Sequence, residues 1–522
     1  YEFPIKNVSS ALGKYSVLDF SSITSEGLYH IEVDNIKSEN FIISKHCYES
    51  SVLKSLNFLR SLRCGEHIEG VHSKCHLNCR TKHEDGRSVP NFGGWHDAGD
   101  VSQFEIPTAE IAASLLDLSY VFSSEMNDRI LEESKIGLDW LYQTRFKDGY
   151  RALTVTYSIW RDNVLDPTNK TIYTNIAERG AFENCLSSIA FVKGAKTFSK
   201  SNKTYSEFLL KLAIEDFDFA VYEYDNDIYT KRWGKTICSQ TLGSLLLCAS
   251  LLYTITKDHK YINYIENNVT TLIKTQESSS SHPMPGFFYE DTEHKYILMY
   301  EHRGHEEYPI LGLINSYKVL KNNALKDAIY NSLVLYSNFI KQSTQYTKPY
   351  NYLPGYVYHK DKINLEHLTV PSNLTREASL EYLGKQIDSG FNLGDGFYLR
   401  IMPISFTRRG FLATLLSKNK AVSELSIFLS DNELKEIAIR QIEWTLGFNP
   451  FSSSLMYGEG YNYHNLYVAF SKQIVGALPV GIMTKENLDI PYWPDYTNAV
   501  FKEIWGHTTG KYLSCLASIL KR

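Results

Sequence analysis

The chain has 522 residues, of which 43% are hydrophobic and 22% charged, so it is long enough to bury a large core. Its formal net charge is only −5 and no long basic run occurs, which disfavours nucleic acid and anionic membrane surfaces as partners. No apolar run approaches the roughly 18 residues that a membrane span needs, and the nearest, LGSLLLCASLLY at 242–253, is too short.

Residues 1–44 have the pattern of β-strands. The stretches SVLDFSS, GLYHIEV and NFIIS alternate or run apolar, and polar turn residues separate them. Three strands are too few for a stable independent sheet, so this segment is either the end of a larger β-domain or leans on the rest of the chain. Residue 1 is tyrosine and no signal peptide is visible, so we expect a chain that was processed or trimmed before this point.

From about residue 48 the pattern becomes helical. Roughly a dozen helices in one body suggest six pairs closed into an α/α toroid, a closure that periodicity alone does not reveal. Catalytic residues tend to lie on loops held by a rigid scaffold, and the long loops at 63–100, 281–309 and 448–507 are the candidates. Helical spacing is clearest at 50–65, 107–122, 128–144, 178–198, 206–224, 241–256, 310–320, 328–343, 407–419 and 432–447.

A cluster of cysteine and histidine lies in the first of these loops, in RCGEHIEGVHSKCHLNCR at 63–80. Cys64, Cys75 and His76 are candidate zinc ligands and His96 is a fourth, because thiolate and imidazole suit Zn²⁺ and four protein ligands make a closed structural site. The alternatives are free thiols or a Cys75–Cys79 disulfide. Other residues that could replace one of these ligands are Cys79, His72 and His83.

The stretch GGWHDAGD at 93–100 places Asp97 and Asp100 three residues apart. Its glycines disfavour a regular helix and let the backbone approach a ligand closely. Two nearby carboxylates resist simultaneous ionisation unless they share a water, a cation or a substrate hydroxyl. This arrangement suits holding a water and taking its proton. The alternatives are an Asp-rich turn or a calcium site.

Near the C-terminus, Glu503 lies in KEIW with Trp505 close by. A carboxyl group among aromatic side chains loses hydration, which raises its pKa and keeps it protonated as a general acid. The alternative is a surface glutamate paired with Lys502. Five N-x-S/T sequons, at Asn7, Asn169, Asn202, Asn268 and Asn373, are a weak indication of secretion.

Taken together, these segments resemble glycoside hydrolase family 9, the inverting cellulase family. GGWHDAGD resembles the family's catalytic aspartate loop, and RCG followed by CH resembles the zinc-binding segment of members that carry an N-terminal immunoglobulin-like domain. Residues 18–44 resemble the closing strands of that domain. RQIEWTLGFNPFSSSLMYGEG at 440–460 resembles the late helix and loop of the family, and KEIW falls where the family places its catalytic acid.

The resemblance implies a mainly α fold, with an (α/α)6 barrel over residues 45–522 that is preceded at 1–44 by the C-terminal part of an immunoglobulin-like β-domain. It implies that Asp100 is the general base, that Asp97 helps to hold the attacking water, and that Glu503 protonates the leaving oxygen. Calcium is frequent in the family, but its ligands are not evident in this sequence. A structural zinc is implied on Cys64, Cys75, His76 and His96.

Two departures from the family pattern bear on the substrate. Endo-acting members typically carry His-His-Arg where this chain has YNYHNLYVAFSKQ, with His464 and no arginine. The loop MYEHRGHEEYP at 299–309 either supports the barrel rim or binds a chain terminus, and Glu306 or Glu307 could recognise an amino sugar. Both departures favour exo action. Substrate contacts are predicted for Trp95, His302, Arg303, His305, Glu306, Tyr463, His464 and Trp505.

We therefore expect a secreted, extracellular, inverting hydrolase of β-1,4-glucosidic bonds in cellulose, β-glucan or derived oligosaccharides. The rival within the same class is an exo-acting β-glucosaminidase or β-glucosidase. The rival from another class is a non-catalytic carbohydrate-binding protein, which is disfavoured because all three carboxyl groups are present. The expected partner is a polysaccharide or oligosaccharide, with no nucleic acid and no membrane span, and the expected state is a monomer or weak dimer.

Overall fold

The computed structural model describes the chain except for residues 78, 100–101, 123–124, 156–173, 231–236, 300–302, 366–373, 405–409, 469–470 and 522. The helices are α1 (Glu49–Ser61), α2 (Glu105–Leu118), α3 (Glu125–Gln143), α4 (Ala181–Phe198), α5 (Lys203–Asp225), α6 (Cys238–Thr256), α7 (His259–Ile273), α8 (Glu307–Val319), α9 (Asn323–Thr344), α10 (Arg376–Asp388), α11 (Leu412–Leu429), α12 (Asn432–Thr445) and α13 (Gly506–Ile519).

The strands are short and lie mostly outside the helical body. They are β1 (Ile5–Ser10), β2 (Gly13–Leu18), β3 (Gly27–Tyr29), β4 (Glu32–Val33), β5 (Ile36–Lys37), β6 (Phe41–Ile43), β7 (Arg80–Lys82), β8 (Ser88–Pro90), β9 (Gln103–Phe104), β10 (Thr154–Val155), β11 (Thr174–Ile176), β12 (Tyr356–His359), β13 (Phe391–Gly394), β14 (Phe397–Arg400), β15 (Met483–Thr484) and β16 (Pro491–Tyr492).

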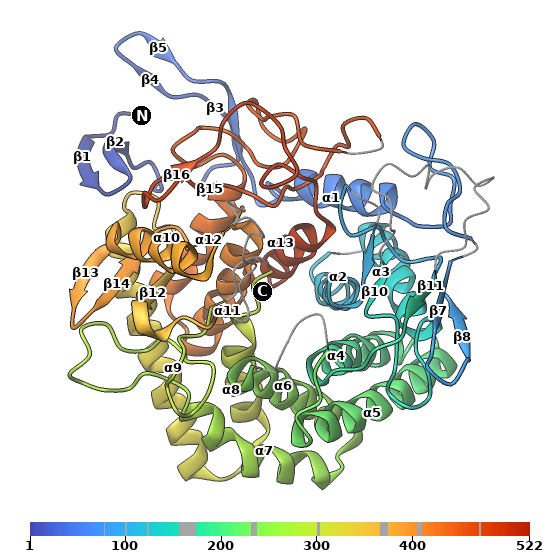
Figure 1. Ribbon diagram of the computed structural model, residues 1–522. Helices are drawn as coiled ribbons and strands as arrows, with labels where there is room; N and C mark the ends of the chain where they lie inside the picture. Colours follow the sequence, from blue (N-terminus) through green and yellow to red (C-terminus); the bar gives the residue numbers. More distant parts are fainter. Residues whose placement is uncertain are drawn as a thin grey trace.

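Six helices form an inner ring in which each contacts the next (Figure 1). Helix α2 packs on α4, α4 on α6, α6 on α8, α8 on α11, α11 on α13, and α13 returns to α2. The other long helices pack outside this ring, with α3 against α2, α5 against α4, α7 against α6, α9 against α8 and α12 against α11. This arrangement confirms the predicted mainly α fold with an (α/α)6 barrel.

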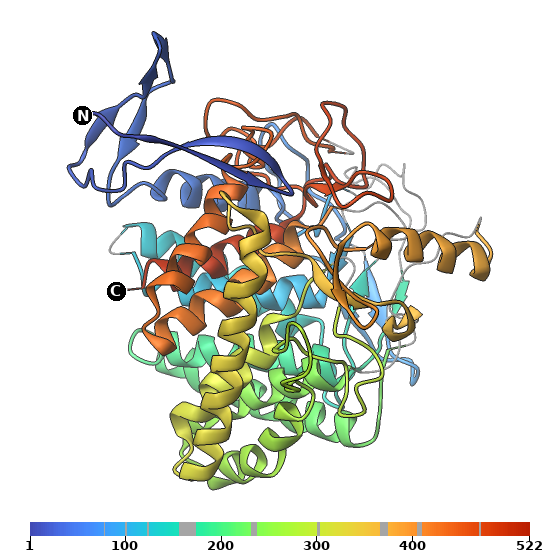
Figure 2. The ribbon, with the colours of Figure 1, turned by 90° about the vertical axis from the view of Figure 1, so that its left-hand side faces the viewer.

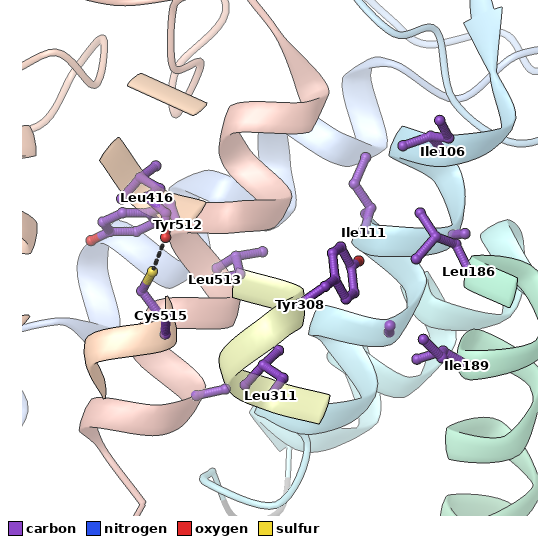
Figure 3. Close-up of a cluster of buried hydrophobic side chains, with 14 of the residues drawn as sticks. Ile106, Ile111, Leu186, Ile189, Tyr308, Leu311, Leu416, Tyr512, Leu513 and Cys515 are labelled. Carbon is purple, nitrogen blue, oxygen red and sulfur yellow. Dashed lines mark hydrogen bonds between the residues drawn. The ribbon is translucent and has the colours of Figure 1, made fainter. Parts of the chain in front are cut away.

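The inner helices are buried on almost every face, because they meet neighbours on both sides and across the barrel. In the close-up of the core, Ile111 of α2 lies between Leu186 of α4 and Tyr308 of α8 (Figure 3). On α13, the Cys515 thiol donates to the Leu416 carbonyl of α11 over 3.1 Å (Figure 3). Among the described residues, α6 is the one helix long and apolar enough to cross a membrane, and it is an inner helix that is mostly buried in the ring.

The N-terminal strands form separate two-stranded sheets, β1 with β2, β3 with β6 and β4 with β5. They lie along one side of the helical body rather than within it (Figure 2). Contact with the barrel comes from Tyr15, whose ring meets that of Tyr350 edge-on at 5.2 Å, and from the Asn40 carbonyl, which accepts from the Tyr461 hydroxyl. The segment therefore leans on the barrel. The domain limits 1–44 and 45–522 stay a prediction.

Inner and outer helices alternate along the chain, so all inner helices run in the same direction. The loops that precede them consequently gather at one end of the barrel. The three long loops that the sequence predicts, at 63–100, 281–309 and 448–507, come before α2, α8 and α13. Because α13 neighbours α2 in the ring and α8 lies across the barrel from α2, where the Tyr308 hydroxyl bonds Glu110, the barrel brings these loops together.

Candidate active site

The four predicted metal ligands meet in one buried group. The donor atoms of Cys64, Cys75, His76 and His96 all lie within 4.8 Å of one another. The Cys64 sulfur is 3.3 Å from Nδ1 of His76, the Cys75 sulfur is 3.3 Å from Nε2 of His96, and the two sulfurs are 4.0 Å apart. Zn–S and Zn–N bonds of about 2.3 and 2.0 Å place tetrahedral ligands roughly 3.3–3.8 Å apart, so the donor set fits zinc.

The alternative ligands are not part of this group. His72 lies beside it, in contact with Cys75, but its ring nitrogens face the carbonyl oxygens of Ser73 and Ser61, at 2.8 and 3.2 Å. Cys75 and Cys79 form no disulfide with each other. His83 lies in a different group, with Asp85 and Asp148.

Two further groups of possible metal ligands occur among the described residues, and a basic side chain contacts each. The Arg87 guanidinium bonds both Asp85 and Asp148. In the second group, of Glu110, His305 and His507, Lys511 lies 3.2 Å from the Glu110 carboxylate. A bound calcium would compete with these cations, so the predicted calcium still has no assigned ligands.

The metal-ligand group is joined to the aspartate loop through the end of α1. The His96 amide donates to the Leu62 carbonyl over 2.8 Å, and the Cys64 amide donates to the Gly94 carbonyl over 2.9 Å. Gly94 has φ +64°, and a Cβ there would meet the Trp140 ring at 2.7 Å, so the turn requires glycine. Trp95, a predicted substrate contact, is 2% exposed and its indole N–H donates to Glu133, which supports a packing role.

Asp97 is fixed through both its backbone and its side chain. Its amide donates to the Ser102 carbonyl and its carbonyl accepts from the Gly506 amide, each over 2.7 Å. Its carboxylate oxygen Oδ2 accepts from the indole N–H of Trp505 over 3.0 Å. The second aspartate, Asp100, lies outside the described residues, as does His302 of the predicted substrate contacts.

Glu503 lies two residues before Trp505, on an extended segment that other loops hold in place. Its carbonyl accepts from the Val480 amide over 2.9 Å, and Tyr467 pairs with it in a parallel bridge. Glu503 is half-buried, whereas its neighbours Lys502 and Ile504 are buried. The Lys502 ammonium contacts Nδ1 of His464 at 2.7 Å and lies over the Trp493 ring, so it is engaged away from the glutamate.

The loop before α8 adds a cation next to the carboxyl groups. The Arg303 guanidinium is buried over the rings of Phe104, at 4.7 Å, and Trp505, at 5.5 Å. His305 turns into the barrel, where its Nδ1 lies 3.1 Å from the Glu110 carboxylate. Of the predicted substrate contacts, Arg303 thus lies over the ring of Trp505, which bonds Asp97, whereas His305 faces Glu110. Their role as substrate contacts stays a prediction.

Glu306 has a different environment from the other predicted substrate contacts. It lines an apolar cavity of about 50 Å³ beside Lys418, and it accepts from the Ser417 hydroxyl over 2.9 Å. Burial raises the pKa of Glu306 to about 7, and the Lys418 charge opposes this shift. A lysine beside this carboxyl group does not favour recognition of an amino sugar by Glu306.

The two predicted contacts from the last long loop differ in exposure. Tyr463 is 40% exposed, and its ring packs edge-on against Tyr457 at 5.1 Å. Such a ring can stack on a sugar. His464 is largely covered, because it stacks on Trp493 and bonds Lys502.

A buried ionic network below the site has no signal in the sequence. The Glu110 carboxylate of α2 accepts from the Tyr308 hydroxyl of α8 over 2.8 Å and contacts His507 and Lys511 of α13. Lys511 also bonds Glu307 over 2.8 Å. These residues are far apart in sequence and meet only because the ring closes, so local patterns could not reveal the network.

Glu105→Gln should stabilise the protein progressively more as the pH rises from 5 to 8. Burial raises the pKa of Glu105 from 4.5 to about 8, against the attraction of Arg151. Through this range the folded state therefore keeps a proton that the unfolded state has lost, and rising pH favours unfolding. Glutamine does not titrate, so at pH 8 the unfolding temperature of the variant should be about a few degrees higher than that of wild type.

The measurement is the unfolding temperature of both proteins at pH 5 and pH 8, with exposed Glu132→Gln as the matched control. A difference between Glu105→Gln and wild type that stays constant with pH would contradict the buried, protonated state of Glu105.

Comparison with known proteins places these features in a family. The model of glycosyl hydrolase family 9 matches residues 48–471. A cellodextrinase of Butyrivibrio fibrisolvens is 25% identical over 278 residues, which is 47% of this chain and 49% of that protein. Endoglucanase 3 of Arabidopsis thaliana is 24% identical over 440 residues, 80% of this chain and 77% of that protein. This chain spans about half the length of the curated relatives that it first matches.

Solved structures share the fold. A metagenome-derived family 9 endoglucanase has a TM-score of 0.69 at 16% identity, covering 98% of this chain and 87% of that one. A zinc-binding triple mutant of the family 9 endoglucanase J30 has a TM-score of 0.67 at 17% identity, covering 99% and 93%.

Proposed function

This chain belongs to glycosyl hydrolase family 9, and we propose that it hydrolyses β-1,4-glucosidic bonds in cellulose, β-glucan or derived oligosaccharides with inversion at the anomeric carbon. The observation that carries the proposal is the bond from Trp505 to Asp97, which joins the aspartate loop to the Glu503 segment across 408 residues of sequence. The segments that resemble the family's catalytic aspartate and glutamate motifs are thereby neighbours, which supports the proposal.

In the proposed mechanism, Asp100 takes a proton from water that Asp97 helps to hold, while Glu503 protonates the leaving oxygen. An inverting enzyme needs room for this water, so the base and acid carboxyl groups should lie about 6.5–9.5 Å apart. The half-buried position of Glu503, between buried neighbours, suits a group that must exchange a proton with the substrate.

An exo-acting β-glucosidase is the second candidate, and a specific observation favours it. Arg303 covers the rings of Phe104 and Trp505 beside Asp97, so these aromatic faces are not open to a continuous glucan chain on that side. The Butyrivibrio relative is named a cellodextrinase, which also supports short substrates.

A substrate panel separates these possibilities. We expect the protein to turn over at least one member of a panel that contains cellulose, mixed-linkage β-glucan, cellodextrins, chitosan and aryl β-glycosides. A ladder of products indicates endo action, and release of one monosaccharide indicates exo action. NMR early in the reaction should show the α-anomer first. A first-formed β-anomer would contradict inversion, and no turnover on the whole panel would leave a carbohydrate-binding protein.

We propose a structural zinc on Cys64, Cys75, His76 and His96, supported by the donor types and their spacing. The ion would hold the loop that carries Asp97 against the end of α1, and it takes no part in the chemistry.

We also propose that residues 1–44 are the end of an immunoglobulin-like β-domain, because their small sheets leave Leu28, Ile36 and Ile42 exposed. Secretion and a monomeric or weakly dimeric state stay predictions.

A further inference from the structure

We propose that Trp505 is a positioning residue that fixes Asp97 relative to Glu503. The inference rests on the proposed hydrolase activity and assigns a role to a side chain outside the three predicted catalytic carboxyl groups. The sequence predicts that Trp505 contacts substrate, but it is 2% exposed and its polar atom faces a carboxylate of the site. Its place in the molecule is therefore between the catalytic groups rather than on the surface that binds sugar.

Trp505 links the aspartate loop to the Glu503 segment through both its side chain and its backbone. The indole N–H donates to Oδ2 of Asp97 over 3.0 Å, and the backbone of Trp505 pairs with Ala98 in an antiparallel bridge. The next amide, of Gly506, donates to the Asp97 carbonyl over 2.7 Å. Side chain and backbone thus tie the same two segments together, with Glu503 only two residues away.

The indole ring of Trp505 is itself held in place by its neighbours. His507 packs edge-on against it with ring centroids 4.9 Å apart, and the Arg303 guanidinium lies 5.5 Å from its centroid. His507 is in turn bonded to the Glu110 carboxylate, so the support reaches into α2. A side chain clamped in this way fixes the direction of its N–H.

An aspartate carboxylate needs such a partner to hold its orientation. The terminal torsion of aspartate is broad, so packing alone defines it poorly. A directed donor on Oδ2 defines the plane of the carboxylate and hence the position of its other oxygen. A catalytic water must be held within a few tenths of an ångström of its productive place, and this bond supplies that constraint at Asp97.

The test is Trp505→Phe, which keeps an aromatic ring and removes the N–H. We expect kcat on the best substrate of the panel to fall about 10- to 100-fold, with KM changed less than about threefold, because orientation rather than binding is lost. The matched control is Trp444→Phe. Trp444 is a buried tryptophan of α12 that packs against Tyr350 and Tyr352, so the kcat of this variant should stay near wild type.

A double-mutant cycle identifies the partner. If Trp505 acts through Asp97, then adding Trp505→Phe to Asp97→Asn should lower kcat by less than about twofold further. An undiminished loss in the Asp97→Asn background, or an unchanged kcat in the single variant, would overturn the inference. In either case a large loss in Glu503→Gln would leave the hydrolase assignment standing.

A measurement without turnover covers the case in which Trp505→Phe does not fold or no substrate is found. In ¹⁵N-labelled wild type, the indole N–H resonance of Trp505 should shift on Asp97→Asn, because an amide replaces the carboxylate acceptor. The corresponding Trp444 resonance should not move. An unmoved Trp505 resonance would show that the bond is absent and would reject the inference independently of the activity.

Discussion

Glu503→Gln should lower kcat on cellodextrins by about 10²- to 10⁴-fold while leaving the fold intact. Glutamine matches glutamate in shape but cannot give a proton to the leaving oxygen. A substrate with a dinitrophenyl leaving group needs no such proton, so the variant should keep most of its activity on a dinitrophenyl β-cellobioside. Steady-state rates on the two substrates, with the unfolding temperature as a check on folding, measure the effect.

The complementary variant has a different signature. Asp100→Asn removes the proposed base, which is needed whatever the leaving group is, so both substrates should slow by a similar factor. The control is Glu486→Gln, which changes an exposed glutamate in the loop at 448–507 that also carries Glu503. This variant should retain full activity. Equal losses on both substrates in Glu503→Gln would remove its assignment as the acid.

Cys75→Ser should abolish the bound metal and destabilise the protein by about 4 kcal/mol or more, as losses of structural metals do. The variant leaves three ligands and a buried hydroxyl in a group that otherwise offers two thiolates. Activity should fall with stability, because His96 directly precedes Asp97 and the loop loses its anchor. Metal analysis and thermal unfolding of the purified protein report both effects.

Cys79→Ser is the matched control for this prediction. Cys79 is also a buried cysteine outside any disulfide, four residues further along the chain, and it is not among the four grouped ligands. This variant should keep about one zinc per chain. Wild-type protein without zinc after preparation in zinc-containing medium would remove the metal assignment.

The sequence predicted most helices because their apolar spacing is local, but it missed α7, α10 and α13. Helix α13 reads GHTTGKYLSCLASI, with two glycines and two threonines that have low helix propensity, and it is buried on nearly all faces. The burial of α13 in the barrel stabilises this helix despite the low helix propensity of these residues. The closure of the ring by α13 against α2 joins segments far apart in sequence, so no periodicity could reveal it.

The predicted metal ligands span 64–96 and lie together in the structure, and their signal in the sequence is local because it consists of ligand types and their spacing. The bound zinc and the catalytic roles stay predictions. Trp505 was predicted as a substrate contact and not as a positioning residue. The exposure of its indole ring and the direction of its N–H depend on Arg303 and His507, which pack against it only in the folded protein. The Glu110 network was not anticipated, because its carboxylate meets partners from α8 and α13 only in the folded barrel.

The contact between α13 and α2 also sets an order of events during synthesis. Translation proceeds at about 5–20 residues per second, so the 408 residues between Asp97 and Trp505 correspond to roughly 20–80 s. During that time a nascent chain has the predicted metal ligands and the aspartate loop but not the proposed acid. Under the proposed function, the ability to cleave a glycosidic bond therefore arises only after Glu503 has been made, and a chain that stops before α13 should be inactive toward glucan.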